Sequence, residues 1–297
     1  MSDALPFTGE RFTPECVREI WYEHWHRYAF ASRLARGRRV LDAACGEGYG
    51  SALLARVAAS VLGVDLSTEA VAHAESRYAG TPHLRFEAGD ATALDHLPDA
   101  SFDLIVSFET LEHVTAQERM LDGFSRLLAP HGLLVLSSPD KRTYSEKAGF
   151  RNEFHVRELY REELEAMLAA RFPARRLFGQ KLLFQSAIWD LENAPATVAA
   201  ATAREPSPLS DGLDYEPLYY IAFCAKHDRA LPHLDGRVDL FGDAEESVYA
   251  HYNHEIRKNM AAGGVIADLE RRLAAFERRT DATPRGFLAR LRRLFVR

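Results

Sequence analysis

Three acidic residues in the first third of the chain lie in or directly after short apolar runs. Asp42 lies in RVLDAAC, Asp65 lies in SVLGVDL, and Asp90 ends LRFEAGD. If these runs are parallel strands, their carboxyl ends meet at the edge where open α/β sheets bind ligands. A carboxylate there can accept hydrogen bonds from both hydroxyls of a ribose or from an adenine amino group. The three acids therefore predict a nucleoside site.

Three glycines follow the first run, Gly46, Gly48 and Gly50 in ACGEGYG. Glycine lets the backbone pass close to a ligand because it has no Cβ. Dinucleotide-binding turns space their glycines by two and then three residues, whereas both steps here are two. The spacing disfavours a dinucleotide. It favours a ligand with one nucleoside, whose ribose lies on Asp65 and whose adenine lies beside Asp90.

Residues 38 to 139 resemble the class I S-adenosylmethionine (SAM)-dependent methyltransferase family, through VLDAACGEGYG, the two later acids and LLAPHGLLVLSSPD. The resemblance implies an α/β, Rossmann-like fold with a seven-stranded, mostly parallel sheet whose last strand is antiparallel. It also implies SAM as cofactor and S-adenosylhomocysteine as product. The cofactor-binding residues that we predict here are Asp42, Gly46, Gly48, Gly50, Asp65, Leu66, Asp90, Ala91 and Phe108.

The segments FTGERF, EHWHRYAFA and NEFHVRELY resemble a narrower group. Its members are bacterial methyltransferases encoded with, or fused to, enzymes of surface-polysaccharide assembly, including those that cap O-antigen chains. In that group the Gly-Glu-Arg-aromatic segment and the arginine of His-Arg-Tyr contribute to the cofactor pocket. The resemblance thus adds Phe12 and Arg27 to the predicted site. Related chains often carry Tyr where Phe12 stands, so a hydroxyl contact is missing.

The segment FETLEHV follows the fourth apolar run and carries the predicted catalytic base, His113. A positioned base assists methyl transfer to a hydroxyl. Glu109 precedes it by four residues, so one helical turn would set both on one face, with the carboxylate orienting the imidazole. The alternative is that His113 only caps or packs beside this loop.

The second catalytic candidate is His155 in NEFHV, which follows the fifth run. The loop at this place commonly covers the acceptor pocket in the family, and Asn152, Glu153 and His155 could hydrogen-bond a sugar. A structural role for His155 at the start of a helix is an equal alternative. No tight cluster of oxygen ligands is visible in the sequence, so we predict no metal.

Short β-branched runs alternate with helical patterns from Arg39 to Lys226, which predicts a parallel sheet with covering helices. Residues 193 to 217 read as an inserted loop. We expect an N-terminal helical lid at 1–37, a methyltransferase domain at 38–242 and a helical extension at 243–297.

The extension carries two amphipathic segments. Residues 265–280 show a short seam of coiled-coil spacing, which predicts either a homo-oligomer contact or a helix packed on its own domain. Residues 284–297 form a basic amphipathic pattern that fits peripheral contact with a membrane or a glycosyltransferase, or a packed terminal helix.

The composition limits the functions further. A net charge of −6 argues against nucleic acid as partner. The chain shows no signal peptide and no membrane-spanning run, so we expect it in the cytoplasm, with peripheral attachment at the inner face of the membrane through the tail. We expect methyl transfer to a hydroxyl of a sugar or surface-polysaccharide precursor. The alternatives are a small-metabolite or amine methyltransferase and a non-catalytic SAM-binding assembly subunit.

Overall fold

The computed structural model describes residues 19–188, 190–192, 198–203 and 210–281. It divides into two compact units, Met1–Phe241 and Gly242–Arg297. Of the predicted residues and segments, Phe12 and the basic segment 284–297 lie outside the described residues.

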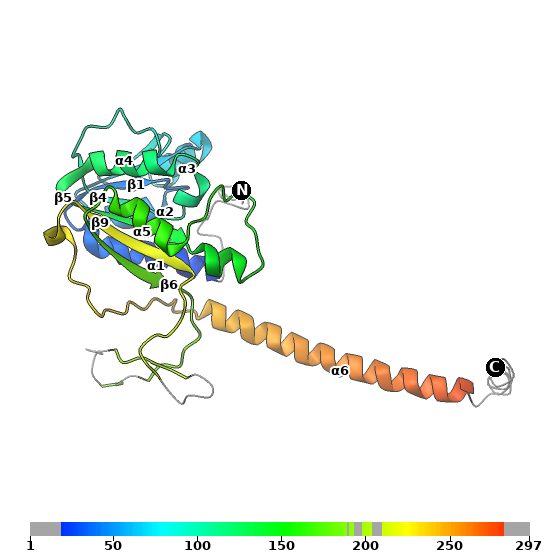
Figure 1. Ribbon diagram of the computed structural model, residues 1–297. Helices are drawn as coiled ribbons and strands as arrows, with labels where there is room; N and C mark the ends of the chain where they lie inside the picture. Colours follow the sequence, from blue (N-terminus) through cyan, green and yellow to red (C-terminus); the bar gives the residue numbers. More distant parts are fainter. Residues whose placement is uncertain (1–18, 189, 193–197, 204–209, 282–297) are drawn as a thin grey trace, which may run out of the picture. The chain divides into compact units, whose positions relative to one another are not determined.

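The first unit is built on a seven-stranded sheet in the order β3-β2-β1-β4-β5-β9-β6 (Figure 1). Neighbouring strands are parallel from β3 to β5, and β9 runs antiparallel to both β5 and β6. The predicted Rossmann-like sheet with an antiparallel last strand is confirmed. The strands are β1 Arg39–Ala43, β2 Ser60–Asp65, β3 Leu84–Ala88, β4 Phe102–Ser107, β5 Leu128–Pro139, β6 Ala174–Gln180 and β9 Tyr219–Ala225.

Helices cover both faces of this sheet. Alternate residues of β1 point to opposite faces, so Val40 belongs to one apolar cluster and Leu41 to the other. The first cluster includes side chains of α1 and α2, and the second includes side chains of α4 and α5. Both faces of the central strands are therefore buried, which explains their continuous apolar character. The helices are α1 Glu19–Ala35, α2 Tyr49–Ala55, α3 Thr68–Arg77, α4 Gln117–Leu127 and α5 Arg161–Ala169.

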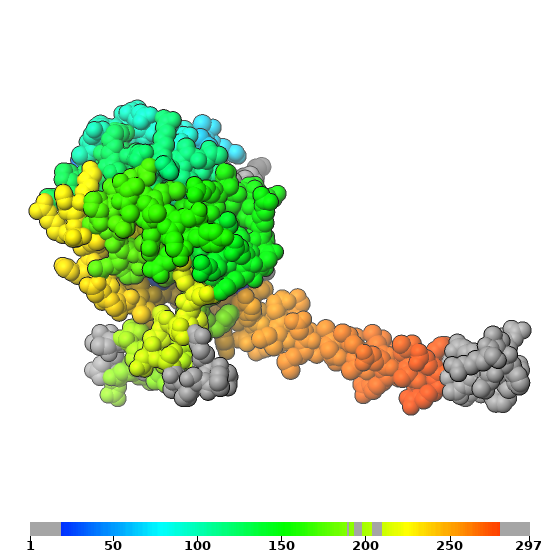
Figure 2. All heavy atoms as spheres, in the orientation of Figure 1, coloured from blue at the N-terminus to red at the C-terminus, as the bar shows by residue number. Residues whose placement is uncertain are grey.

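Short elements connect these layers. A 3-10 turn, η1 Leu111–His113, follows β4, and a π-helical turn, η2 Arg142–Glu146, follows β5; η3 Asp228–Ala230 follows β9. The segment from β5 to β6 forms much of the visible face of the first unit, in green (Figure 2). The stretch predicted as a plain loop contains a two-stranded pair, β7 Ala201–Thr202 with β8 Ser210–Asp211.

The second unit contains one long helix, α6 Ser247–Asp281 (Figure 1). Its predicted seam, Ile266, Leu269, Leu273 and Phe276, is exposed. Among the described residues, none of the helices combines the length and the apolar character needed to span a bilayer.

Candidate active site

The buried carboxylate of Asp42 lies beneath the turn after β1. Asp42 has no exposed surface, and it accepts hydrogen bonds from the Tyr28 hydroxyl (3.0 Å) and the Ser51 hydroxyl (2.6 Å). Burial raises the pKa of Asp42 to about 7, although both hydrogen bonds lower it. Asp42 was predicted to bind the cofactor. The structure places it beneath the glycine turn, where it ties α1 and α2 to β1.

Two of the glycines in this turn make room for aromatic rings of the protein itself. Gly48 has a φ of +89°, and a Cβ there would lie 2.6 Å from the Phe86 ring. A Cβ on Gly50 would lie 2.1 Å from the Tyr28 ring. Gly46 also has a positive φ, +56°. The prediction attributed all three glycines to the approach of a ligand, whereas two of them make room for aromatic rings.

Asp65 lies half-buried at the end of β2. Its Oδ2 accepts a hydrogen bond from the Gly46 backbone N–H (2.8 Å), and its Oδ1 accepts one from the Ser67 N–H (2.9 Å). The structure therefore joins the turns after β1 and β2 through this carboxylate, as the predicted site requires. Leu66 follows it and is 75% exposed.

The remaining predicted cofactor residues lie in two different environments. Asp90 is exposed, and its Oδ1 accepts hydrogen bonds from the backbone N–H (2.7 Å) and the hydroxyl (2.8 Å) of Thr92, while Ala91 is buried beside it. Phe108 is buried with its ring edge-on to Tyr28, 5.0 Å between centroids. Phe108 is thus a core residue in the described chain.

A buried charged cluster centres on Arg27, which is 3% exposed. Its Nε donates to Gln180 Oε1 (2.8 Å), its guanidinium carbon lies 4.4 Å from the centroid of the Tyr219 ring, and one terminal nitrogen lies 3.5 Å from Glu109 Oε1. Neither terminal nitrogen has a hydrogen-bond partner among the described residues. The two terminal nitrogens of this buried cation therefore keep hydrogen-bonding capacity that the described residues do not use, although one of them is ion-paired with Glu109.

Glu23 belongs to the same cluster and was not predicted. Burial raises its pKa to about 7, although Arg27 and a hydrogen bond from Tyr219 lower it. The sequence held a signal for this pair, because Glu23 and Arg27 are four residues apart and so share one face of α1. Tyr219 and Gln180 come from β9 and β6, and their approach depends on the sheet order.

Glu109 has other partners than the predicted one. Its backbone lies in the left-handed region at φ +50°, its N–H donates to Ser137 Oγ (2.8 Å), and that hydroxyl donates back to Glu109 Oε1 (2.6 Å). The predicted helical turn from 109 to 113 is wrong, because the 3-10 turn begins only at Leu111. The carboxylate of Glu109 therefore faces β5 and Arg27, and we withdraw its orienting role toward His113.

The carboxylate beside His113 belongs to Glu112, which was not predicted. Glu112 is 1% exposed, and neither of its carboxylate oxygens has a hydrogen-bond partner among the described residues. Burial, with the charge of Glu109 nearby, raises its pKa well above the usual range. Its backbone carbonyl accepts hydrogen bonds from the N–H groups of Val156 (2.8 Å) and Arg157 (3.1 Å). These bonds bring the NEFHV segment against the 3-10 turn.

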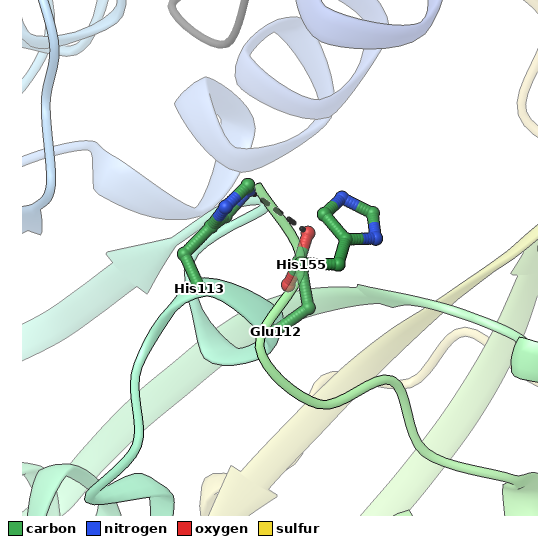
Figure 3. Close-up of side chains that lie close together, drawn as sticks. All are labelled: Glu112, His113 and His155. Atoms are coloured by element: carbon green, nitrogen blue, oxygen red, sulfur yellow. Dashed lines mark ion pairs between the residues drawn. The ribbon is translucent and has the colours of Figure 1, made fainter. Parts of the chain in front are cut away.

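The two predicted catalytic histidines meet at this place. The rings of His113 and His155 lie edge to face with centroids 4.8 Å apart, on either side of the Glu112 carboxylate (Figure 3). His113 Nε2 lies 3.8 Å from Glu112 Oε1, and its Nδ1 lies 3.1 Å from the carbonyl oxygen of Phe154. His155 also stacks on Tyr144 at 5.2 Å. The sequence named both imidazoles, and the fold supplies the carboxylate between them.

A cavity in the described chain lies elsewhere, beside α1, β6 and β9. It has a volume of about 540 Å³, and its walls include Glu23, Arg27 and Gln180 but neither Asp65 nor Glu112. This cavity therefore adjoins the charged cluster, and of the predicted cofactor-binding residues its walls include Arg27.

Comparison with known proteins identifies the domain. The family described as "Methyltransferase domain" matches residues 41–136. A probable S-adenosylmethionine-dependent methyltransferase of Mycolicibacterium smegmatis is 39% identical over 172 residues, which cover 57% of this chain and 65% of that protein. A ubiquinone biosynthesis O-methyltransferase of Paracidovorax citrulli is 37% identical over 105 residues, covering 35% of this chain and 44% of that one. The chain thus spans less than two thirds of the length of these curated relatives.

The fold agrees with this result. The YcgJ protein of Bacillus subtilis superposes with a TM-score of 0.51 at 21% identity, over 69% of this chain and all of that one. Residues 41–136 thus match a methyltransferase domain, and the fold is the Rossmann-like methyltransferase fold that the sequence indicated.

Proposed function

We propose that this protein transfers a methyl group from SAM to a hydroxyl group of a polar acceptor. The observation that carries the proposal is the distribution of polar side chains along one edge of the sheet. Asp65 ends β2 and Asp90 follows β3, whereas Glu112 and His113 follow β4. Ligands of open α/β sheets bind along this edge, so a donor over the first pair would lie next to an acceptor beside the second.

The residues present fit the cofactor. A carboxylate offers about four lone-pair sites, and the backbone contacts of Asp65 use two of them, so ribose hydroxyls can use the others. The exposed side chain of Leu66 would pack against adenine. The two guanidinium nitrogens of Arg27 that lack hydrogen-bond partners among the described residues suit the carboxylate of the methionyl part. When bound, SAM supplies a methyl carbon attached to a positively charged sulfur.

His113 would act on the acceptor. His113 Nδ1 contacts the carbonyl oxygen of Phe154, which can only accept a hydrogen bond. Nδ1 is therefore the protonated nitrogen, and the lone pair is on Nε2. That lone pair can act on the acceptor hydroxyl while the site holds oxygen, methyl carbon and sulfur in line. Such assistance is worth about 10²- to 10⁴-fold in rate.

Two acceptor classes fit this chemistry. A sugar or surface-polysaccharide precursor is favoured by the polar groups around the two histidines: His155 contacts the His113 ring, and Asn152 and Tyr144 contact His155. A small phenolic metabolite is favoured by the relative whose name specifies ubiquinone biosynthesis. We propose the sugar class first, since the described surroundings of His113 offer many hydrogen-bonding groups.

The test uses labelled SAM with nucleotide sugars, glycan fragments and phenols. We expect methylated sugar product, whose formation falls about 10²-fold or more in His113→Ala and is unchanged in the exposed control His96→Ala. Methylated phenol with unreacted sugars would support the second acceptor class.

Binding of S-adenosylhomocysteine is measured in parallel by calorimetry, and Asp65→Ala should weaken it by roughly 100-fold or more, because two charge-assisted hydrogen bonds are lost. Undiminished binding in Asp65→Ala would contradict the cofactor assignment.

A further inference from the structure

We propose that Glu112, His113 and His155 bind a divalent metal cation and that the acceptor oxygen completes its coordination. The first part concerns only the described side chains. The second part rests on the proposed function.

The geometry is close to that of a formed site. One ligand atom from each of the three residues lies within 4.8 Å of the others. Metal–ligand bonds to imidazole nitrogen or carboxylate oxygen measure about 2.0–2.2 Å, so two ligands on opposite sides of a cation lie about 4.2 Å apart. Small side-chain rotations would bring all three atoms to bonding distance. Figure 3 shows the two imidazoles on either side of the Glu112 carboxylate, with the ion pair drawn from His113.

Glu112 supplies an independent indication that something binds here. Nearly all buried polar groups in proteins are hydrogen-bonded, and each exception needs an explanation. Both carboxylate oxygens of Glu112 are buried and lack hydrogen-bond partners in the described chain. A cation would pair with these oxygens and neutralise the buried charge.

The supporting contacts hold both imidazoles in the form that binds metals. His113 Nδ1 lies against the Phe154 carbonyl oxygen (3.1 Å), and His155 Nδ1 lies against Glu158 Oε1 (2.6 Å). Each acceptor fixes the proton on Nδ1 and leaves the lone pair on Nε2. Metal-ligating histidines almost always donate their other ring N–H to a carboxylate or a backbone carbonyl in this way.

One contact has to change when the cation binds. The Asn152 side-chain amide lies 3.0 Å from His155 Nε2 and donates to it, since that nitrogen carries the lone pair. A cation at Nε2 replaces this hydrogen bond. Asn152 keeps its second contact, from the Phe154 N–H to Oδ1 (3.0 Å), and so remains beside the site.

The donor set indicates which cation fits. Two imidazoles with one carboxylate suit first-row transition metals such as Mn²⁺, Fe²⁺ or Zn²⁺, and three protein ligands leave open positions for substrate.

A bound cation would polarise an acceptor hydroxyl and lower its pKa, so that the proton leaves to solvent. The resulting oxygen forms the new bond to the methyl carbon. The carbon–sulfur bond breaks, and its electron pair stays on sulfur. His113 then acts as a metal ligand, because one lone pair cannot also take up the proton.

The experiment titrates the metal-free full-length protein with Mn²⁺, following free Mn²⁺ by electron paramagnetic resonance. We expect one cation per chain. Glu112→Gln should weaken binding more than the roughly 10- to 100-fold typical of losing a supporting partner, and Glu158→Gln should fall in that range. Glu153→Gln is the matched control, because Glu153 is exposed in the same segment as His155. Unfolding curves confirm that each variant is folded.

Failure to bind Mn²⁺ in the wild type, or an equal loss in Glu153→Gln and Glu112→Gln, would overturn the metal site. Turnover tests the second part: a chelator should abolish methyl transfer and added Mn²⁺ should restore it, whereas chelator-resistant turnover would refute metal-assisted transfer. If S-adenosylhomocysteine fails to bind while Mn²⁺ binds in the Glu112-dependent manner, the proposed function fails and the metal site stands.

Discussion

The two sides of the ligand edge differ in how their charged groups are paired. On the β1–β3 side, Asp42 and Asp65 accept hydrogen bonds from two hydroxyls and from two backbone N–H groups. On the β4–β9 side, the buried side chains of Arg27 and Glu112 both keep polar atoms without hydrogen-bond partners among the described residues.

This difference distinguishes groups that stabilise the fold from groups that are available to bind a ligand. Paired groups on the β1–β3 side stabilise the turns that they join. Buried polar atoms without hydrogen-bond partners destabilise the folded chain, since each loses its hydration without full compensation. Such groups concentrate at functional sites. The β4–β9 side therefore contains groups whose missing partners a bound ligand could supply.

The largest expected effect on stability comes from the β4–β9 side. Arg27→Met should lower the free energy of unfolding by about 3–5 kcal/mol, because Glu23 and Glu109 are left without their buried cation. Urea denaturation measures this free energy. Arg33→Met is the control on the same helix, where an exposed pair with Asp239 contributes at most about 1 kcal/mol. If Arg27→Met and Arg33→Met lowered the free energy of unfolding equally, the interactions of Arg27 with Glu23 and Glu109 would not contribute to stability.

The second effect is a pH dependence on the β1–β3 side. The pKa of Asp42 is about 7 in the folded chain, above its usual value of 3.8. The folded protein therefore holds this proton more tightly than the unfolded chain, and the associated stability is complete below pH 4 and is lost as the pH rises through 7. In Asp42→Asn this loss is absent.

Unfolding of wild type and Asp42→Asn between pH 4 and pH 7 tests this expectation. The variant should gain stability relative to wild type by on the order of 1 kcal/mol per pH unit. Asp103→Asn is the control, because the hydrogen bond from Arg39 lowers the pKa of Asp103 and moves its titration below this range. A difference that does not change with pH would contradict the buried, protonated state of Asp42.

The smallest effect compares the two sides directly. Ser51→Ala removes a donor to Asp42 and should lower the free energy of unfolding by about 1–3 kcal/mol. Glu112→Met, which replaces an unpaired buried carboxylate by an apolar side chain of similar length, should leave stability unchanged or raise it by about 1 kcal/mol. Thermal unfolding without added metal measures both. A large loss in Glu112→Met would mean that its oxygens have structural partners.

Much of the fold could be predicted because its signals are local. Short β-branched runs predicted the strands of the sheet, and both faces of those strands are buried as such runs require. The same local pattern placed Asp65 and Asp90 at strand ends. The packing contacts of the glycines could not be predicted, because the rings of Tyr28 and Phe86 that they accommodate come from other elements.

The sequence by itself determined which chemistry-bearing residues the chain carries and the edge of the sheet at which most of them lie, because strand ends and turns follow from local patterns. Tertiary structure alone decided which of them meet. A positive φ at Glu109 turns its carboxylate toward Ser137 and Arg27, and backbone hydrogen bonds to the Glu112 carbonyl bring His155 to His113. These contacts join residues far apart in the chain, and only the packing of the whole domain determines them.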